Sequence, residues 1–401
     1  IMKLFQKLLL TPAVIGFLAP VTAHASESSL NDVSNYSQVD VQVTQDTFKP
    51  LSSKNPLLAG GEGLNQNVSN DFDGDTFSST TTASFNTNWV VGRVEESPSH
   101  EAVNFVWDWE LNLSSSFTGN DSLDFTLVSG YNGTNVVPDI DINNTSGDLI
   151  KVDGITYTSQ LGERVSFFVG QNGAPGSTLY ANACAYGGQT DVLDDCGIRE
   201  SNLDEGLGAA AGVAIDFGGG FTGAFGYEGQ AGTKGLLTKE ATDAIGAQVA
   251  YTGDNYGVAV AVSSIENHAD ATGNLTSTTD RHVTTSTGIS AYFVPTIENF
   301  PSVSVGIEST HDQSAAASAD EKSNYFVGLQ WDDFGQGTLG AAFGSKAPEP
   351  ENDDSEKMYE VFYSYNYADG ITITPLMFVK ENAAANTGDE TGVFVKTSFS
   401  F

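Results

Sequence analysis

The chain has 401 residues and a strong excess of acid, with 51 Asp and Glu against 16 Lys and Arg and a formal net charge of −35. It therefore lacks the basic surface that binding to nucleic acid requires, which excludes nucleic-acid partners. Hydrophobic residues make up 39% of the chain, and 24 residues are Phe. This content argues against an intrinsically disordered acidic protein.

The N-terminus has the pattern of a cleavable export signal. Lys3 and Lys7 precede an apolar run at residues 8–21, and an A-x-A motif ends at Ala25. The run is too short for a stable membrane-spanning helix, and its flanks are those of a signal peptide. We expect residues 1–25 to be a signal peptide cleaved after Ala25.

The remainder of the chain divides into a short polar segment and a long alternating one. Residues 26–75 are rich in Ser, Asn, Gln and Asp and are expected to form a polar periplasmic linker or arm. From residue 76 to residue 401, apolar and polar residues alternate with period two, which is typical of β-strands. In residues 103–113 every odd position is large and apolar, and the even positions include Asp108 and Glu110.

Sixteen strands are expected from this pattern. They cover residues 80–94, 102–117, 122–131, 154–160, 165–170, 209–217, 221–228, 244–252, 256–265, 283–294, 302–309, 323–331, 338–344, 358–367, 371–380 and 392–401. Pro375 has no N–H to donate, so it predicts an interrupted ladder inside its strand.

Short turns alternate with long polar connections between these strands, which is the layout of an outer-membrane barrel. Aromatic residues such as Tyr256, Tyr367 and Phe401 stand at strand ends, where membrane barrels carry aromatic girdles. The sequence therefore predicts an all-β fold, a closed transmembrane antiparallel β-barrel of about 16 strands at residues 76–401. With about 16 strands, a closed sheet with polar inward faces surrounds a water-filled channel.

Several segments resemble one known family. Residues 363–375 (YSYNYADGITITP) resemble the penultimate hairpin of cyanobacterial porins of the carbohydrate-selective porin (OprB-like) superfamily. Residues 391–401 are similar to the terminal strand of these porins, which ends in Phe. Residues 77–82 and 111–119 look like their first barrel strands, and residues 2–9 look like their signal sequence.

The resemblance covers residues 77–401 and implies a cyanobacterial outer-membrane porin, a passive channel for ions, sugars or inorganic nutrients including iron. It implies a homotrimer in outer-membrane lipid, with Phe401 recognised by the barrel-assembly machinery. Many members carry an S-layer-homology domain before the barrel. Residues 26–75 are too short for that domain, which puts anchoring to the cell wall in question.

Two cysteines lie in the longest connection, residues 171–206. Cys184 and Cys196 are an even pair in an exported chain, which predicts one disulfide, with two free thiols as the alternative. Porins of this general type fold their third long loop into the barrel, and this connection is the third.

The same connection is strongly acidic. Its charged residues are Asp191, Asp194, Asp195, Glu200, Asp204 and Glu205, with Arg199 as the only base. One hypothesis is a constriction that prefers cations, because acidic rings favour cations in channels. The alternative is a solvated acidic cap without selectivity. Asp108 and Glu110 add to the charge of the lumen in the first interpretation and are ordinary polar lining in the second.

No catalytic, nucleotide-binding or metal-binding motif is present in the sequence, which predicts neither an enzyme nor a cofactor or metal site. Two other classes remain open. A receptor or adhesin barrel would use its long loops to bind a partner and would have no open pore. A secreted sandwich or propeller would also show strand alternation. Phosphate is disfavoured as a solute, because anion pores use Arg and Lys.

Overall fold

The structure is a computed structural model of the chain. It describes residues 81–401 apart from 96–101, 132–139, 141, 143–148, 182, 205, 231–234, 239–240, 269–280, 298, 314–319, 346–348, 351–355 and 383–387. The predicted signal peptide with its cleavage site at Ala25, the polar arm and Glu205 lie outside the described residues.

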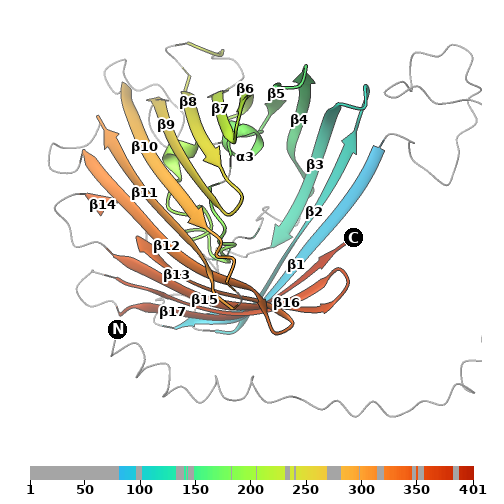
Figure 1. The fold of residues 1–401 in the computed structure, drawn as a ribbon. Helices are drawn as coiled ribbons and strands as arrows, with labels where there is room; N and C mark the ends of the chain where they lie inside the picture. Colours follow the sequence, from blue (N-terminus) through green and yellow to red (C-terminus); the bar gives the residue numbers. More distant parts are fainter. Residues whose placement is uncertain are drawn as a thin grey trace, which may run out of the picture. The chain divides into compact units, whose positions relative to one another are not determined.

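The described residues form one antiparallel sheet that closes on itself (Figure 1). Sixteen strands make the wall of this barrel, and β14 (Glu349–Pro350) is a two-residue piece beside β12. The wall strands are β1 (Thr81–Glu95), β2 (Asn104–Ser115), β3 (Asp121–Tyr131), β4 (Lys151–Leu161), β5 (Val165–Gln171), β6 (Ala209–Gly218), β7 (Phe221–Gly229), β8 (Asp243–Thr252), β9 (Tyr256–His268), β10 (Arg281–Phe293), β11 (Ser302–Asp312), β12 (Glu321–Phe334), β13 (Gly337–Ser345), β15 (Lys357–Ala368), β16 (Ile371–Lys380) and β17 (Glu390–Ser400).

Closure joins the two ends of the wall. β1 pairs with β17 from Asn86↔Ser400 to Glu95↔Thr391, and its other edge pairs with β2. Phe401 extends this seam, because its N–H donates to the carbonyl of Phe85 at 3.0 Å and its carbonyl accepts from the Phe85 N–H at 2.8 Å. A closed sheet leaves no unpaired strand edge, which is the condition for a sheet to cross lipid.

The fold predicted from the alternating pattern is confirmed, with all sixteen wall strands near their expected places. The interruption expected at Pro375 is also present. The ladder between β15 and β16 runs to Phe362↔Leu376 and resumes at Tyr365↔Ile373, which leaves Pro375 without a partner on β15. The missing N–H of proline explains this gap.

Outward and inward faces alternate along each strand. On β9, Val258, Val260 and Val262 are exposed on the outside, whereas Ala259 and Ala261 are buried on the inside. Exposed aromatic side chains occur near strand ends, including Phe217, Phe221, Tyr256, Phe293, Tyr367 and Phe401. This placement agrees with an aromatic girdle at a lipid–water boundary. Among the described residues, no helix has the length and apolar character needed to span a bilayer.

Candidate functional site: a loop inside the barrel

The connection between β5 and β6, residues 172–208, lies inside the ring of strands, and we call it the inner loop (Figure 1). It contains the short helix α3 (Pro175–Leu179) and the 3-10 turn η3 (Glu200–Asn202). Backbone N–H groups of the loop donate to side chains on the inward face of distant strands. The Ala181 N–H reaches Gln248 Oε1 on β8 at 2.7 Å, and the Gly187 N–H reaches Gln330 Oε1 on β12 at 2.8 Å.

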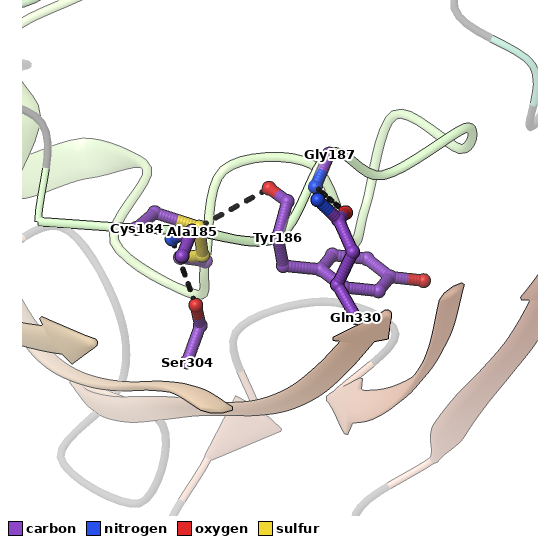
Figure 2. The surroundings of a disulfide bond; sticks show 7 residues. Cys184, Ala185, Tyr186, Gly187, Ser304 and Gln330 are labelled. Atoms are coloured by element: carbon purple, nitrogen blue, oxygen red, sulfur yellow. Dashed lines mark hydrogen bonds between the residues drawn. A yellow bond between two sulfur atoms is a disulfide. The ribbon is translucent and has the colours of Figure 1, made fainter. Parts of the chain in front are cut away.

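The disulfide predicted between Cys184 and Cys196 is present in the structure and closes a loop of twelve positions against the wall (Figure 2). Beside it, the Ala185 N–H donates to Ser304 Oγ on β11 at 2.8 Å. Cys196 is buried, and the carbonyl of Cys196 packs directly on Gly306 of β11. The disulfide therefore constrains the part of the inner loop that lies against β11.

Glycines on the inward face make room for this contact. A Cβ on Gly306 would lie 1.7 Å from the carbonyl oxygen of Cys196, and one on Gly288 of β10 would lie 2.1 Å from Ser201 Oγ. Real Cβ atoms do not come so close, so Gly306, which faces a backbone atom, requires glycine for this seating, whereas at Gly288 the side chain of Ser201 would have to move. In the sequence, these glycines are indistinguishable from other small inward residues.

An apolar cluster inside the barrel corrects the expectation of polar inward faces. Tyr186 and Leu193 of the inner loop pack against wall residues, together with Ile140 from the connection between β3 and β4. The buried wall residues of this cluster are Val90, Val94, Val106, Phe326, Ala342, Met358, Phe362, Leu376, Phe378 and Phe394. The expectation was wrong at these positions because a chain segment, and not water, covers that part of the wall.

The predicted constriction residues occupy different environments along the inner loop. Asp191, Asp195 and Asp204 are exposed, whereas Asp194, Arg199 and Glu200 are half-buried. The Arg199 guanidinium lies 3.2 Å from the Asp195 carboxylate, so the single base of the loop pairs within the loop. Glu205 lies outside the described residues.

Strand β2 of the wall carries the two predicted strand acids. Asp108 is buried and accepts hydrogen bonds from both the backbone N–H and the side-chain amide of Asn88, at 3.1 and 2.9 Å. Glu110 is half-buried, and Asp108 and Asp153 lie close enough for their charges to act on it. Asp108 and Glu110 share a hollow of about 340 Å³ with Lys396.

A second cavity, of about 370 Å³, lies between the start of the inner loop and the inward face of β3 and β4. Asp204 of the loop lines this cavity together with Asp153 and Thr156 of β4. Asp204 is open to this space, but the protein around it partly desolvates its carboxyl and raises the pKa above the ordinary value. The sequence did not indicate that Asp153 belongs with the loop acids.

No group of three or more His, Cys, Asp or Glu side chains suited to a metal ion occurs among the residues that the structure describes. The described residues form a closed wall, an inner loop inside it, and acidic groups on both the loop and the wall.

No family model and no curated protein matches the sequence. Solved structures match the fold. The high-pH structure of Pseudomonas putida OprB has a TM-score of 0.57 at 10% identity, covering 80% of this chain and 94% of that one. The fold is that of the outer-membrane porins. An anion-selective porin from Comamonas acidovorans matches with a TM-score of 0.57 at 13% identity, covering 80% and 99% of the two chains. Salmonella typhi OmpF in complex with daunomycin matches with a TM-score of 0.53 at 11% identity, covering 80% and 97%.

Proposed function

We propose that this chain is an outer-membrane porin, a passive diffusion channel for small hydrophilic solutes and ions that prefers cations. The observation that carries the proposal is the inner loop, which is seated inside a closed sixteen-stranded wall. A sixteen-stranded barrel is wide enough for an aqueous channel, and a loop inside it narrows the bore to the scale of small solutes.

The preference for cations is argued from the charges along the remaining passage. Asp191, Asp195 and Asp204 of the inner loop are exposed, and Glu110 is half-buried on the wall. Acidic groups at close quarters lower the energy of a permeating cation and raise that of an anion. The fold alone does not give this preference, since a porin of the same fold is anion-selective.

The remaining features of the proposal rest on the sequence. Export through residues 1–25 follows from their signal-peptide pattern. Recognition of Phe401 by the barrel-assembly machinery and a homotrimer in outer-membrane lipid follow from the resemblance to cyanobacterial porins. One structural neighbour, OmpT of Vibrio cholerae, is described in a trimer form. The proposal assigns transport and no catalytic activity to the chain.

The test is single-channel recording of the refolded protein in a planar bilayer under a salt gradient. We expect stable open steps and a reversal potential on the cation-selective side. Asp194→Asn/Asp195→Asn should move the reversal potential toward zero, because it removes two negative charges from the inner loop. The matched control is Asp332→Asn/Asp333→Asn, an exposed adjacent pair near the β12–β13 turn, which should have a smaller effect.

A folded barrel without open steps would contradict the proposal and favour the receptor or adhesin alternative. Folding is checked independently by heat-modifiable migration on gels, which separates a membrane barrel from a secreted sandwich or propeller. If Asp194→Asn/Asp195→Asn shows open steps with unchanged ion selectivity, the protein is a channel but these two acids do not contribute to its selectivity.

A further inference from the structure

We infer that three buried glutamates on the barrel wall, Glu228 of β7, Glu308 of β11 and Glu360 of β15, are positioning residues that fasten the inner loop and thereby set the width of the pore. The statement about pore width rests on the proposed function, whereas the fastening does not. Each carboxylate accepts hydrogen bonds from loop groups, and the three contact successive parts of the loop.

Glu308 holds the turn η3. Its Oε2 accepts from the backbone N–H of Ser201 at 2.8 Å and from the hydroxyl of the same residue at 2.6 Å. Its Oε1 accepts from the backbone N–H of Glu200 at 3.3 Å. Glu308 is only 3% exposed, so water does not replace these donors when the loop is in place. Hydrogen bonds to an ionised acceptor are stronger than neutral ones, and they are strongest where water is excluded.

Glu360 holds the segment next to the disulfide. Its Oε1 accepts from the hydroxyl of Tyr186 at 2.7 Å, and the backbone N–H of Gln189 points between its two oxygens at 3.1 and 3.2 Å. Glu360 is 4% exposed. Glu228 is completely buried and receives the backbone N–H of Leu207 at 3.1 Å, near the end of the loop.

The chemistry of the Glu308 and Glu360 contacts favours a carboxylate. Each glutamate faces N–H or O–H donors of the loop, and a carboxylate offers two acceptor oxygens. Glutamine has the same shape but replaces one oxygen with an amide group that donates, so a loop donor would face another donor. Glu308→Gln and Glu360→Gln therefore remove acceptors while they conserve side-chain volume.

The experiment uses trypsin, because Arg199 is the only Lys or Arg among residues 172–208. Arg199 follows the disulfide inside the barrel, where a protease cannot reach it unless the loop leaves the lumen. We expect Glu308→Gln and Glu360→Gln to speed cleavage after Arg199 by roughly tenfold to a hundredfold. This factor is the change in the equilibrium between the seated and the open inner loop that follows the loss of a hydrogen bond to a charged group. Glu321→Gln, an exposed wall position at the rim, loses the same charge and should cleave like the parent protein.

Ser201→Ala gives an independent measurement from the loop side, since it deletes one donor to Glu308 and leaves the wall intact. It should speed cleavage by a smaller factor and stays informative if a wall variant fails to fold. Cleavage rates equal to those of the parent in folded Glu308→Gln, Glu360→Gln and Ser201→Ala would overturn the inference. Because cleavage needs no conductance, the fastening is tested even if no open steps occur. If the protein forms open channels, variants that are cleaved faster should also show larger or noisier conductance steps. Variants that are cleaved faster but keep the steady conductance steps of the parent protein would refute the link to pore width.

Discussion

The hydroxyl of Tyr186 donates a hydrogen bond to Glu360 Oε1 at 2.7 Å and joins the inner loop to a wall strand 174 residues away. The ring of Tyr186 lies 5.4 Å from that of Phe326 and 5.8 Å from that of Phe362. Burial first, and the Glu360 charge second, raise the pKa of Tyr186 above its ordinary value. The phenol therefore stays protonated and keeps its donor role throughout the physiological pH range.

Tyr186→Phe keeps the ring and removes this donor. We expect the barrel to lose about 1.5–3 kcal/mol of stability, because a buried carboxylate loses a hydrogen-bond partner. The measurement is thermal unfolding in detergent, followed by heat-modifiable migration. Tyr363→Phe is a suitable control, since the Tyr363 hydroxyl bonds a backbone carbonyl at an exposed turn. Equal midpoints for Tyr186→Phe and the parent would show that the hydrogen bond contributes little.

Gly306→Ala tests the close seating of the loop on β11. The added methyl group would overlap the carbonyl oxygen of Cys196, so the loop must move away from the wall. We expect faster tryptic cleavage after Arg199 and a change in single-channel conductance. Gly154→Ala is the matched control, because the nearest atom to its new Cβ is 3.4 Å away. Similar cleavage rates for the two variants would contradict the seating described here.

The disulfide between Cys184 and Cys196 should stabilise the folded inner loop. In a chain-entropy treatment, a closed loop of this size contributes about 3 kcal/mol. Cys184→Ala/Cys196→Ala, or treatment with a reductant, should therefore increase the tryptic cleavage after Arg199 while the wall remains folded. Alkylation of free thiols followed by mass measurement reports the state of the bond, because both cysteines stay in the fragment that ends at Arg199. Unchanged cleavage after complete reduction would show that wall contacts suffice.

Opposite charges in the hollow formed by β1, β2 and β17 should have opposite effects on selectivity. Lys396 shares this hollow with Glu110. Lys396→Gln removes a positive charge and should increase the preference for cations, whereas Glu110→Gln should decrease it. Reversal potentials under a salt gradient measure both effects. Shifts of the same sign in the two variants would indicate a change in pore shape and not in charge.

Asp204 predicts a pH dependence of selectivity. Its carboxyl loses its negative charge as the pH falls through its pKa, which partial desolvation raises above the ordinary value. The preference for cations should therefore begin to decline at a higher pH than for an ordinary aspartate. Asp204→Asn should remove this early part of the decline. Superimposable pH profiles for the variant and the parent would exclude a contribution from Asp204.

The candidate site was only partly visible in the sequence. The length of the inner loop, its acids and its two cysteines are local features, and they pointed to the segment that lies inside the barrel. Glu228, Glu308 and Glu360 gave no signal, because each is one polar residue among many at inward positions. Their role depends on which loop groups donate hydrogen bonds to them. For Glu308 and Glu360 these donors are more than a hundred residues away in the chain, and no local sequence pattern encodes such contacts.

Period-two alternation by itself determined the strands, their inward and outward faces and the even number that closes the wall, because pleating places successive side chains on opposite faces. Only the tertiary structure decided what covers the inward face. Val90 and Phe394 belong to a buried cluster that includes residues of the inner loop, and Gly306 is glycine because a backbone carbonyl lies against it. Backbone periodicity is a local property, whereas the path of a loop through the lumen depends on contacts between residues far apart in the chain.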